Sequence, residues 1–235
     1  MTKGILITIA LALAPAVAFA QTPKAATYIT DEEVKAVNAT PGVDRTIRVV
    51  DIGHENFAVG IIHRGATGGG ARGTGAGDAR GGAGRGGANA AGGGGAGRGA
   101  GGGGGRAGGT PVPCGEQATA PPAGGTPGGI AHDSQTEGYL IVSGGGTLVT
   151  GGHIVNGTKS AADAPVTTEL NGPSCGGMIA GSDVVKRVVK TGDIIIIPAG
   201  VPHGWTDITD HVDYLSFRPS QRVLTAGYVH PSIKK

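Results

Sequence analysis

The chain has 235 residues, a formal net charge of +2 at pH 7 and only 3% aromatic residues. This nearly neutral charge excludes a strong general attraction to nucleic acid or to acidic surfaces, and charge alone names no partner. Glycine is very frequent, with 49 residues. When the main glycine tract and the N-terminal segment are set aside, about 150 residues remain, a typical size for one domain.

The N-terminal segment Met1–Ala20 has the pattern of a secretory signal peptide. Lys3 provides a charged start, Ile5–Val17 is apolar, and Ala18-Phe19-Ala20 forms a small-x-small cleavage site. The alternative is an uncleaved membrane anchor, but the apolar run is shorter than the ~20 residues that a spanning helix needs. We therefore expect a secreted or periplasmic protein with no membrane attachment after cleavage.

The first ordered part is predicted to contain one helix and two strands. Thr30 and Glu33 form a capping box at the start of a helix over Tyr28–Ala39. The alternation over Arg45–Asp51 predicts a strand, and Phe57–Arg64 is predicted to return beside it after a turn.

A glycine-rich insertion is predicted at 65–128, between a first ordered part at 21–64 and a second at 129–235. Its centre, Gly65–Thr110, is more than half glycine. Such a segment buries too little apolar area to offset its conformational entropy, so we expect it to be disordered. The cost of closing a loop grows slowly with length, so a surface loop of the fold can carry the insertion.

Arginine interrupts this insertion, and Arg80-Gly81-Gly82 and Arg85-Gly86-Gly87 are RGG steps. Segments of this kind can bind nucleic acid. Here no aromatic side chain is present to stack on bases, and the protein is expected to be exported, so nucleic acid is not an expected partner. A flexible soluble insertion is the preferred interpretation, and loose adhesion to anionic surface or matrix polymers is the alternative.

The second ordered part is predicted to consist of short strands that are separated by glycine and proline turns, a pattern typical of an all-β sandwich or barrel. A turn is expected at Gly144-Gly145-Gly146 and a polar excursion at Gly151–Leu170. The predicted strands are Glu137–Ser143, Thr147–Thr150, Val184–Val189, Ile194–Ile197, Val212–Phe217 and Arg222–Val229.

The isoleucine run Ile194–Ile197 is the most informative of these strands. Four consecutive apolar residues suit a strand that is buried on both faces. Pro198 and Gly200 then favour a tight reversal, and His203 follows three residues later. We expect His203 to lie near the mouth of a small barrel, where a metal or ligand can bind.

Two spaced motifs in this region resemble those of the cupin superfamily. The first is Gly124-x5-Ile130-x-His132-x4-Glu137-x6-Gly144, and the second is Gly192-x5-Pro198-x-Gly200-x2-His203-x3-Asp207. The resemblance covers about residues 45–64 and 125–218. It implies a cupin-type double-stranded β-helix, or jelly roll.

The resemblance places a mononuclear metal site at His132, Glu137 and His203. His132 and Glu137 are five residues apart and would not share a face of one straight strand. They can meet if Asp133–Thr136 forms a turn. Two imidazoles and a carboxylate suit Fe(II), while Mn, Ni, Zn or Co are alternatives.

Ile130 departs from the motif, because the family has a histidine ligand at this position. A barrel that has lost its metal is therefore an open alternative. His63, in the predicted strand before the insertion, is a candidate for the third imidazole, and a strand histidine with no metal role is the other interpretation.

Two aromatic residues share faces with the candidate ligands: Tyr139 with Glu137, and Trp205 with His203. Tyr139 is a candidate catalytic residue that donates its hydroxyl to a substrate or acts as an acid. Packing in the core is the alternative for both aromatic side chains.

The two cysteines, Cys114 and Cys175, suggest one disulfide if the protein is exported. It would link the end of the glycine tract to the loop at Asn171–Gly177. Two free thiols are the alternative.

Three functions fit these expectations. The first is an exported metal-binding cupin that acts on a small organic molecule, as an oxygenase, isomerase or cyclase. The second is a non-catalytic barrel that binds a small ligand, and the third is a surface or matrix protein that uses its Gly/Arg-rich tract. Cupins often form dimers through sheet edges, so a homodimer is also an expectation.

Overall fold

The structure is a computed structural model that describes residues 25–67 and 111–233. The predicted signal segment, residues 1–20, and most of the predicted insertion, residues 68–110, lie outside the described residues. Within the described residues, no helix is both long enough and apolar enough to cross a membrane.

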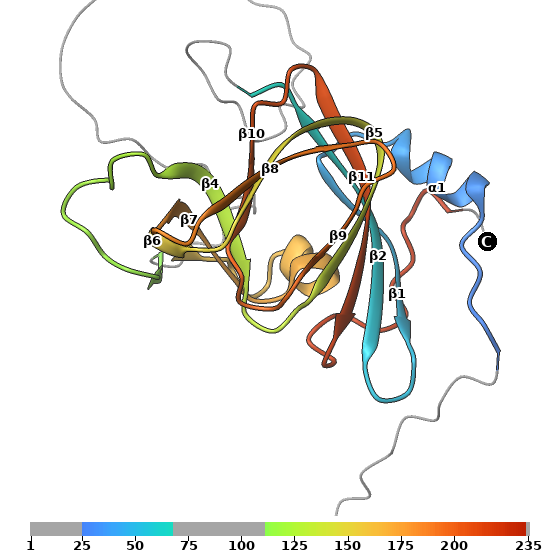
Figure 1. The fold of residues 1–235 in the computed structure, drawn as a ribbon. Coiled ribbons are helices and arrows are strands. Elements are labelled where there is room, and N and C mark those ends of the chain that lie inside the picture. The colour runs from blue at the N-terminus through green and yellow to red at the C-terminus, as the bar shows by residue number, and fades with distance from the viewer. Residues whose placement is uncertain (1–24, 68–110, 234–235) are drawn as a thin grey trace, which may run out of the picture.

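The regular secondary structure of the described residues is almost entirely β-strand, with one short α-helix and one π-helical turn (Figure 1). The elements are α1 (Asp31–Asn38), β1 (Asp44–Asp51), β2 (Asn56–Gly65), β3 (Pro113–Cys114), β4 (Thr126–His132), β5 (Glu137–Thr150), β6 (His153–Lys159), η1 (Thr167–Asn171), β7 (Ser174–Ala180), β8 (Val185–Lys190), β9 (Ile194–Ile197), β10 (His203–Thr206) and β11 (His211–Ser220).

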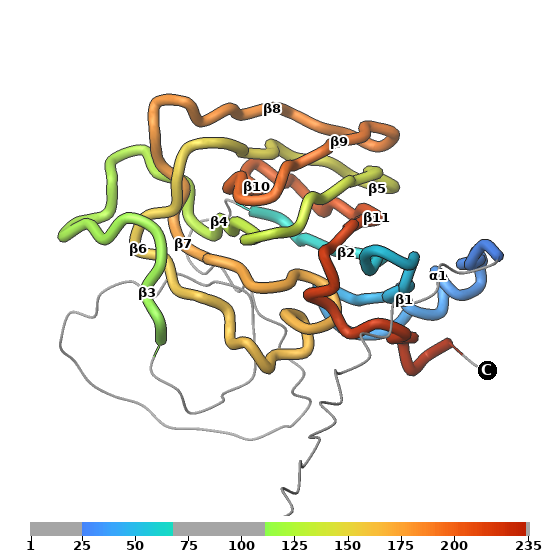
Figure 2. The backbone as a smooth tube through the Cα atoms, turned by 90° about the horizontal axis from the view of Figure 1, so that it is seen from below, coloured from blue at the N-terminus to red at the C-terminus, as the bar shows by residue number. Residues whose placement is uncertain are grey.

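The strands pair in the order β1-β2-β11-β5-β10-β4-β7-β6-β3, and β8 and β9 also pair with β5. All these pairings are antiparallel. The strands curve around a common interior, and β3, β6 and β7 lie at the end of the molecule away from α1 (Figures 1 and 2). This is the cupin-type jelly roll that the two motifs predict.

The helix α1 confirms the predicted capping box. The Thr30 hydroxyl accepts from the backbone N–H of Glu33, and the Glu33 carboxylate accepts from the backbone N–H of Thr30. Val37 of this helix is fully buried and belongs to an apolar cluster with Ile47 and Ile61. The helix therefore covers the outer face of β1 and β2.

One continuous strand, β5, replaces the two strands and the glycine turn that the sequence predicts. Its first half pairs with β11 and β9, and its second half pairs with β10 and β8. A Cβ at Gly144 would lie 2.0 Å from the carbonyl oxygen of His211, and one at Gly145 would lie 2.5 Å from that of Val189. The glycines thus allow neighbouring strands to approach closely where β5 passes from its pairing with β11 and β9 to its pairing with β10 and β8.

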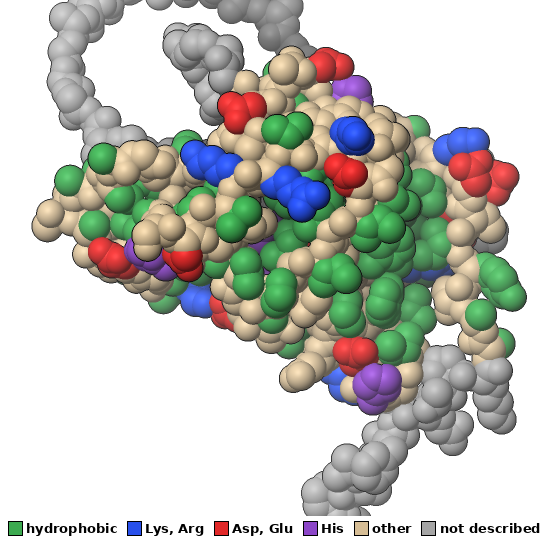
Figure 3. All heavy atoms as spheres, in the orientation of Figure 1, with side chains coloured by type: hydrophobic (Ala, Val, Ile, Leu, Met, Phe, Trp, Pro, Cys, Tyr) green, Lys and Arg blue, Asp and Glu red, His purple; other side chains and the backbone are tan. Residues whose placement is uncertain are grey.

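The isoleucine run forms β9 as predicted, but it is not buried on both faces. Ile195 and Ile197 face the core, whereas Ile194 and Ile196 are each 73% exposed. The reason is that β9 pairs only with β5 and nothing among the described residues covers its outer face. Figure 3 shows apolar side chains on this face of the molecule.

Three further predictions need correction. Strands are present before residue 129, because β3 pairs with β6 and β4 begins at Thr126. The predicted polar excursion contains β6 and η1. Arg222–Val229 is not a strand, since it contributes only an isolated bridge between Val229 and Arg48.

Cys114 and Cys175 form a disulfide, as predicted for an exported protein. Cys175 lies within β7 rather than in a loop, and it packs in an apolar cluster with Val149, Ile154 and Ile179. The bond therefore fastens the short edge strand β3 to the end of the barrel.

Replacing both cysteines with serine is expected to destabilise the protein by about 4 kcal/mol. This value follows from the chain entropy of a closed loop whose ends are 61 residues apart. Urea unfolding of the oxidised protein, the reduced protein and the double variant measures the change. Reduced wild type should match the variant, and equal midpoints for all three samples would contradict a stabilising role.

Candidate metal centre

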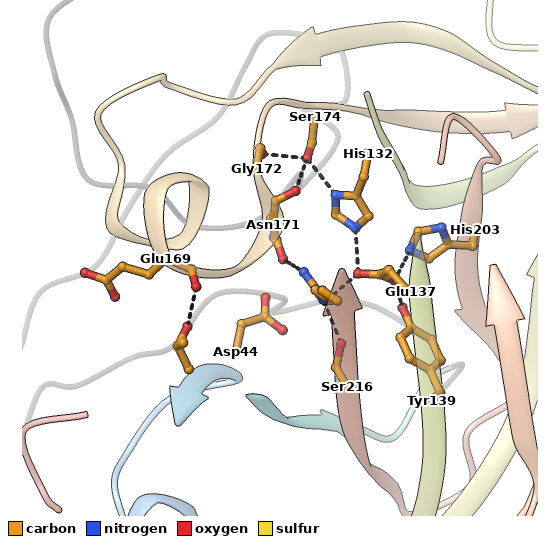
Figure 4. Close-up of polar contacts among 12 residues, drawn as sticks. Asp44, His132, Glu137, Tyr139, Glu169, Asn171, Gly172, Ser174, His203 and Ser216 are labelled. Carbon is orange, nitrogen blue, oxygen red and sulfur yellow. Dashed lines mark hydrogen bonds and ion pairs between the residues drawn. The ribbon is translucent and has the colours of Figure 1, made fainter. Parts of the chain in front are cut away.

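Three side chains from three strands meet inside the barrel (Figure 4). His132 lies at the end of β4, Glu137 begins β5, and His203 begins β10. The His132 Nε2 atom lies 3.0 Å from Glu137 Oε1, and the His203 Nε2 atom lies 3.1 Å from Glu137 Oε2. All three side chains are at most 5% exposed. In the described part of the chain, they form the one group of three or more potential ligands with atoms within 4.8 Å.

The strand order explains this convergence. β10 lies between β4 and β5, so the two motifs do not form separate hairpins. Residues 133–136 bend the chain from His132 to Glu137, as predicted. The turn of the second motif contacts the first directly, because the backbone N–H of Gly200 donates to the carbonyl of His132 at 2.7 Å. Gly200 has φ +80°, a conformation that favours glycine.

Each imidazole is held through its Nδ1 atom. The His203 Nδ1 atom is 3.1 Å from the carbonyl oxygen of Val201, which can only accept, so His203 Nδ1 carries a proton. The His132 Nδ1 atom is 2.7 Å from Ser174 Oγ. The Ser174 hydroxyl donates to the carbonyl of Gly172 at 2.9 Å, so its oxygen accepts from His132.

These hydrogen bonds determine which ring nitrogen of each histidine faces Glu137. A neutral imidazole with a proton on Nδ1 has a lone pair on Nε2. In both histidines the Nε2 atom is the one close to the carboxylate. When both imidazoles are neutral, two lone pairs and a carboxylate point at each other, an arrangement that is unfavourable unless a cation lies among them.

Glu137 has two further partners. Arg218 Nη2 lies 2.6 Å from Glu137 Oε1, and the Tyr139 hydroxyl donates to Glu137 Oε2. Despite its two close nitrogens, Glu137 Oε1 is a buried oxygen without a hydrogen bond of good geometry. Its lone pairs are thus available to a ligand.

The electrostatics favour the ligand forms of these groups. Burial would raise the pKa of the Glu137 carboxyl, but the Arg218 guanidinium and the neighbouring imidazoles outweigh it and hold that pKa well below its usual range. Burial lowers the pKa of His132, and the carboxylate of Glu137 does not fully compensate. Burial, and next the charge of Glu137, raise the pKa of Tyr139 well above its usual value. The cluster therefore holds an ionised carboxylate, a neutral His132 and a protonated tyrosine.

The segment from the end of η1 to the start of β7 supports both the histidine and the arginine. Ser174 holds His132, and the Asn171 side-chain oxygen accepts from Arg218 Nη1. Arg218 Nε also donates to Ser216 Oγ at 2.7 Å. One short stretch of chain thus orients two groups that both contact Glu137 Oε1.

The two motifs do not include Arg218, Ser174 or Asn171. A signal for Arg218 exists in β11, where Val212, Tyr214, Ser216 and Arg218 share the buried face. A charged residue on the apolar face of an alternating strand requires a buried partner. Ser174 and Asn171 have no such signal, because a serine and an asparagine are ordinary in turns.

The structure places the other predicted site residues as follows. Tyr139 lies in the cluster, and Trp205 packs at its side against the ring of Tyr214, at 5.7 Å between ring centroids. Ile130 is half-buried and directly opposes His203 in the pairing of β4 with β10. His63 is not brought into the cluster.

His63 lies on the opposite face of β2 from Ile62, which belongs to the barrel core. Its Nδ1 atom pairs with Asp213 Oδ1 at 2.6 Å, and its ring stacks on His211. The side chain is 44% exposed. His63 is therefore not one of the candidate ligands of this centre.

The separations in the cluster fit a metal. Two neighbouring ligand atoms with bonds of about 2.1 Å to a transition metal lie roughly 3.0 to 3.4 Å apart. The two nitrogen–oxygen distances, 3.0 and 3.1 Å, agree with this range. Two imidazoles and one carboxylate are also a donor set that first-row transition metals accept.

No family model and no curated protein matches this chain. Among solved structures, it is similar to oxalate oxidase in complex with the substrate analogue glycolate, with 13% identity over 78% of this chain and a TM-score of 0.31. The chain spans about half, 54%, of that protein. It is also similar to Peruvianin-I, described as a cysteine peptidase from Thevetia peruviana latex, with 10% identity, 85% and 82% of the two chains covered and a TM-score of 0.30. Function is therefore inferred from the geometry of the cluster.

The metal-free protein is expected to lose stability as the pH falls. Because the pKa of His132 is lower in the folded protein than its ordinary 6.5, the unfolded chain takes up that proton first below about pH 6.5. Glu137 adds a loss in the same direction below its ordinary 4.5. One proton of difference gives a slope of up to about 1.4 kcal/mol per pH unit.

Urea unfolding in the presence of a chelator between pH 8 and pH 4 measures this slope. His132→Gln removes the first titrating group, so the variant should show a flatter dependence between pH 6.5 and pH 5. A wild-type stability that is constant or rises over this interval would contradict the assignment.

Ser174→Ala is expected to weaken metal binding by about 10- to 100-fold, because His132 loses the acceptor that fixes its ring and tautomer. Calorimetric titration with Mn²⁺ or Zn²⁺ measures the affinity. Ser143→Ala is the matched control, since the Ser143 hydroxyl also contacts an imidazole, His211 Nε2 at 2.9 Å, but outside the cluster. Equal affinities for the two variants would show that Ser174 has no such role.

Proposed function

We propose that this chain is an exported, metal-dependent protein of the cupin type that acts on a small organic molecule. The observation that carries the proposal is the convergence of the Nε2 atoms of His132 and His203 on the carboxylate of Glu137 inside the barrel, while hydrogen bonds hold both Nδ1 atoms. A divalent cation between these atoms would turn a repulsive arrangement into a favourable one.

His132, Glu137 and His203 would hold the metal, and Fe, Mn, Zn or Ni each suits this donor set. When bound, the metal would supply Lewis-acid or oxygen-activating chemistry. Three protein ligands leave positions open for a substrate. This chemistry is compatible with an oxygenase, an isomerase or a cyclase, and the residues do not select one of these.

Tyr139 is proposed as the residue that keeps Glu137 in place. Its hydroxyl donates to Glu137 Oε2, and its raised pKa keeps the proton on the phenol at neutral pH. A substrate oxygen that reaches the Tyr139 hydroxyl would compete for the same proton, which is the role of a hydrogen-bond donor rather than of a base.

Export is proposed on two grounds. The N-terminal segment has the pattern of a signal peptide, and the Cys114–Cys175 disulfide is typical of an oxidising compartment.

A non-catalytic barrel that binds a small ligand is the second candidate. Ile130 favours it, because an alkyl side chain stands beside His203 where the motif has a ligand. Such a barrel would keep its ligand when the metal is removed, whereas a metal-dependent protein would release it.

The metal content of full-length protein purified without chelator tests the first candidate. We expect about one equivalent of a divalent transition metal, and a higher melting temperature when Mn²⁺, Fe²⁺, Zn²⁺ or Ni²⁺ is added after its removal. Glu137→Gln should weaken binding at least tenfold because it removes the only charged ligand of the three.

Glu116→Gln is the matched control, because Glu116 also pairs with an imidazole, His153 at 2.9 Å, but at the surface. His203→Gln provides a second variant in case Glu137→Gln fails to fold. Wild-type protein that contains no metal, and neither binds nor is stabilised by any of the four ions, would overturn the proposal.

A further inference from the structure

A buried arginine is the feature of this cluster that metal binding alone does not explain. Arg218 is 3% exposed and keeps its positive charge, because a guanidinium does not deprotonate in proteins. It contacts Oε1 of Glu137, whereas His203 contacts Oε2. Ser216 and Asn171 orient its remaining nitrogens. The position of this cation is thus built into the fold.

The charges in the cluster balance only without a metal. The negative charge of Glu137 cancels the positive charge of Arg218, and both histidines can be neutral. A divalent metal would leave two uncompensated positive charges in a buried site, which is strongly unfavourable. A cluster that holds a divalent metal therefore needs an anion to balance its charge.

The described residues do not supply that anion. Glu137 is the one carboxylate among them within 4.0 Å of Arg218. Asp44, the nearby acid drawn in Figure 4, is paired with Arg64 at 2.7 Å. Glu169 points away from the cluster (Figure 4), and its side chain contacts Tyr228.

Arg218 also has the donors that an anion requires. Its hydrogen bonds to Ser216 and Asn171 use two of its five N–H groups, and its Nη2 atom is ion-paired with Glu137 Oε1. The other N–H groups have no hydrogen bond among the described residues. A planar guanidinium matches a carboxylate better than it matches any neutral group of the same size.

Buried polar atoms without hydrogen-bond partners also lie at the end of β11, the strand that carries Arg218. Gln135 is 1% exposed, and neither its amide oxygen nor its amide nitrogen has a hydrogen bond. Gln135 bridges to Ser220, which follows Arg218 on the same face of β11 and has a buried hydroxyl that also lacks a partner. Buried polar atoms normally have partners, so water or a polar ligand is expected beside them.

We propose that Arg218 is a specificity-determining residue that binds the carboxylate of a small organic acid next to the metal. This inference rests on the proposed metal site and names the class of its substrate. Arg218 would bind the substrate directly, while His132, Glu137 and His203 hold the metal.

The test compares lactate with lactamide, which has nearly the same shape and a hydroxyl but no charge. Full-length protein loaded with Mn²⁺ is titrated with each compound, and binding is followed by the melting temperature and by the electron paramagnetic resonance spectrum of the bound Mn²⁺. We expect lactate to bind at least tenfold more tightly than lactamide.

Arg218→Gln should reduce this preference to less than threefold, and Arg218→Lys should give an intermediate value. Mn²⁺ itself should bind Arg218→Gln at least as tightly as wild type, because a neighbouring positive charge is removed. A residue with only a structural role would weaken both kinds of binding. Arg187→Gln, which removes an exposed arginine on β8, is the matched control and should behave as wild type.

Equal binding of lactate and lactamide by wild type, or an unchanged preference in Arg218→Gln, would overturn the inference while leaving the metal site in place. Failure of wild type to bind Mn²⁺ would overturn the proposed function instead. If Arg218→Gln does not fold, Arg218→Lys decides: a preference equal to that of wild type would overturn the inference, and a reduced one with Mn²⁺ affinity retained would support it.

Discussion

A carboxylate that remains ionised inside a β-barrel is the constraint on which the rest of the site depends. Glu137 is fully buried, and its charge is compensated by Arg218 rather than by water. Removing one partner from a buried ion pair costs about 3–5 kcal/mol, because the other charge is left uncompensated. Glu137 and Arg218 therefore have to be considered together, in stability as well as in function.

The backbone brings these charges together through one strand and one turn. β5 carries Glu137 and Tyr139 at its start, where it pairs with β11, and continues through Gly144-Gly145-Gly146 to pair with β8. Asn171, at the end of η1, holds Arg218, and Ser174, at the start of β7, holds His132. π-Helical turns are rare and are often found at functional sites, and here the turn ends at the residue that orients the arginine.

The parts of the fold that were predictable have short-range causes. The capping box at Thr30 and Glu33 predicts α1, and the Pro198-x-Gly200 turn places His203 at the start of a strand. The two spaced motifs predicted three residues that the structure brings together, although they lie up to 71 positions apart in the sequence. Local sequence patterns likewise predicted β1, β2, β8, β9 and β11 close to their bounds.

What could not be predicted depends on partners that are distant in the sequence. The exposure of Ile194 and Ile196 follows from the position of β9 at the outer side of β5, which no local pattern specifies. The continuity of β5 through three glycines depends on how closely the carbonyls of His211 and Val189 approach. Arg218 joins the site only because β11 pairs with β5, so its role emerges from the sheet order.

Ile130 and Arg218 together change what the loaded site would require. The motif position at Ile130 provides an alkyl group instead of an imidazole, and this residue faces His203 across the strand pair. An apolar neighbour excludes water and strengthens every charge interaction inside the site. Arg218 adds a positive charge in the same dry environment. Compared with a site that has a histidine at position 130 and no buried arginine, this site has one metal ligand fewer and one positive charge more. It would bind a neutral substrate poorly, because the substrate has to supply both a metal ligand and the missing negative charge.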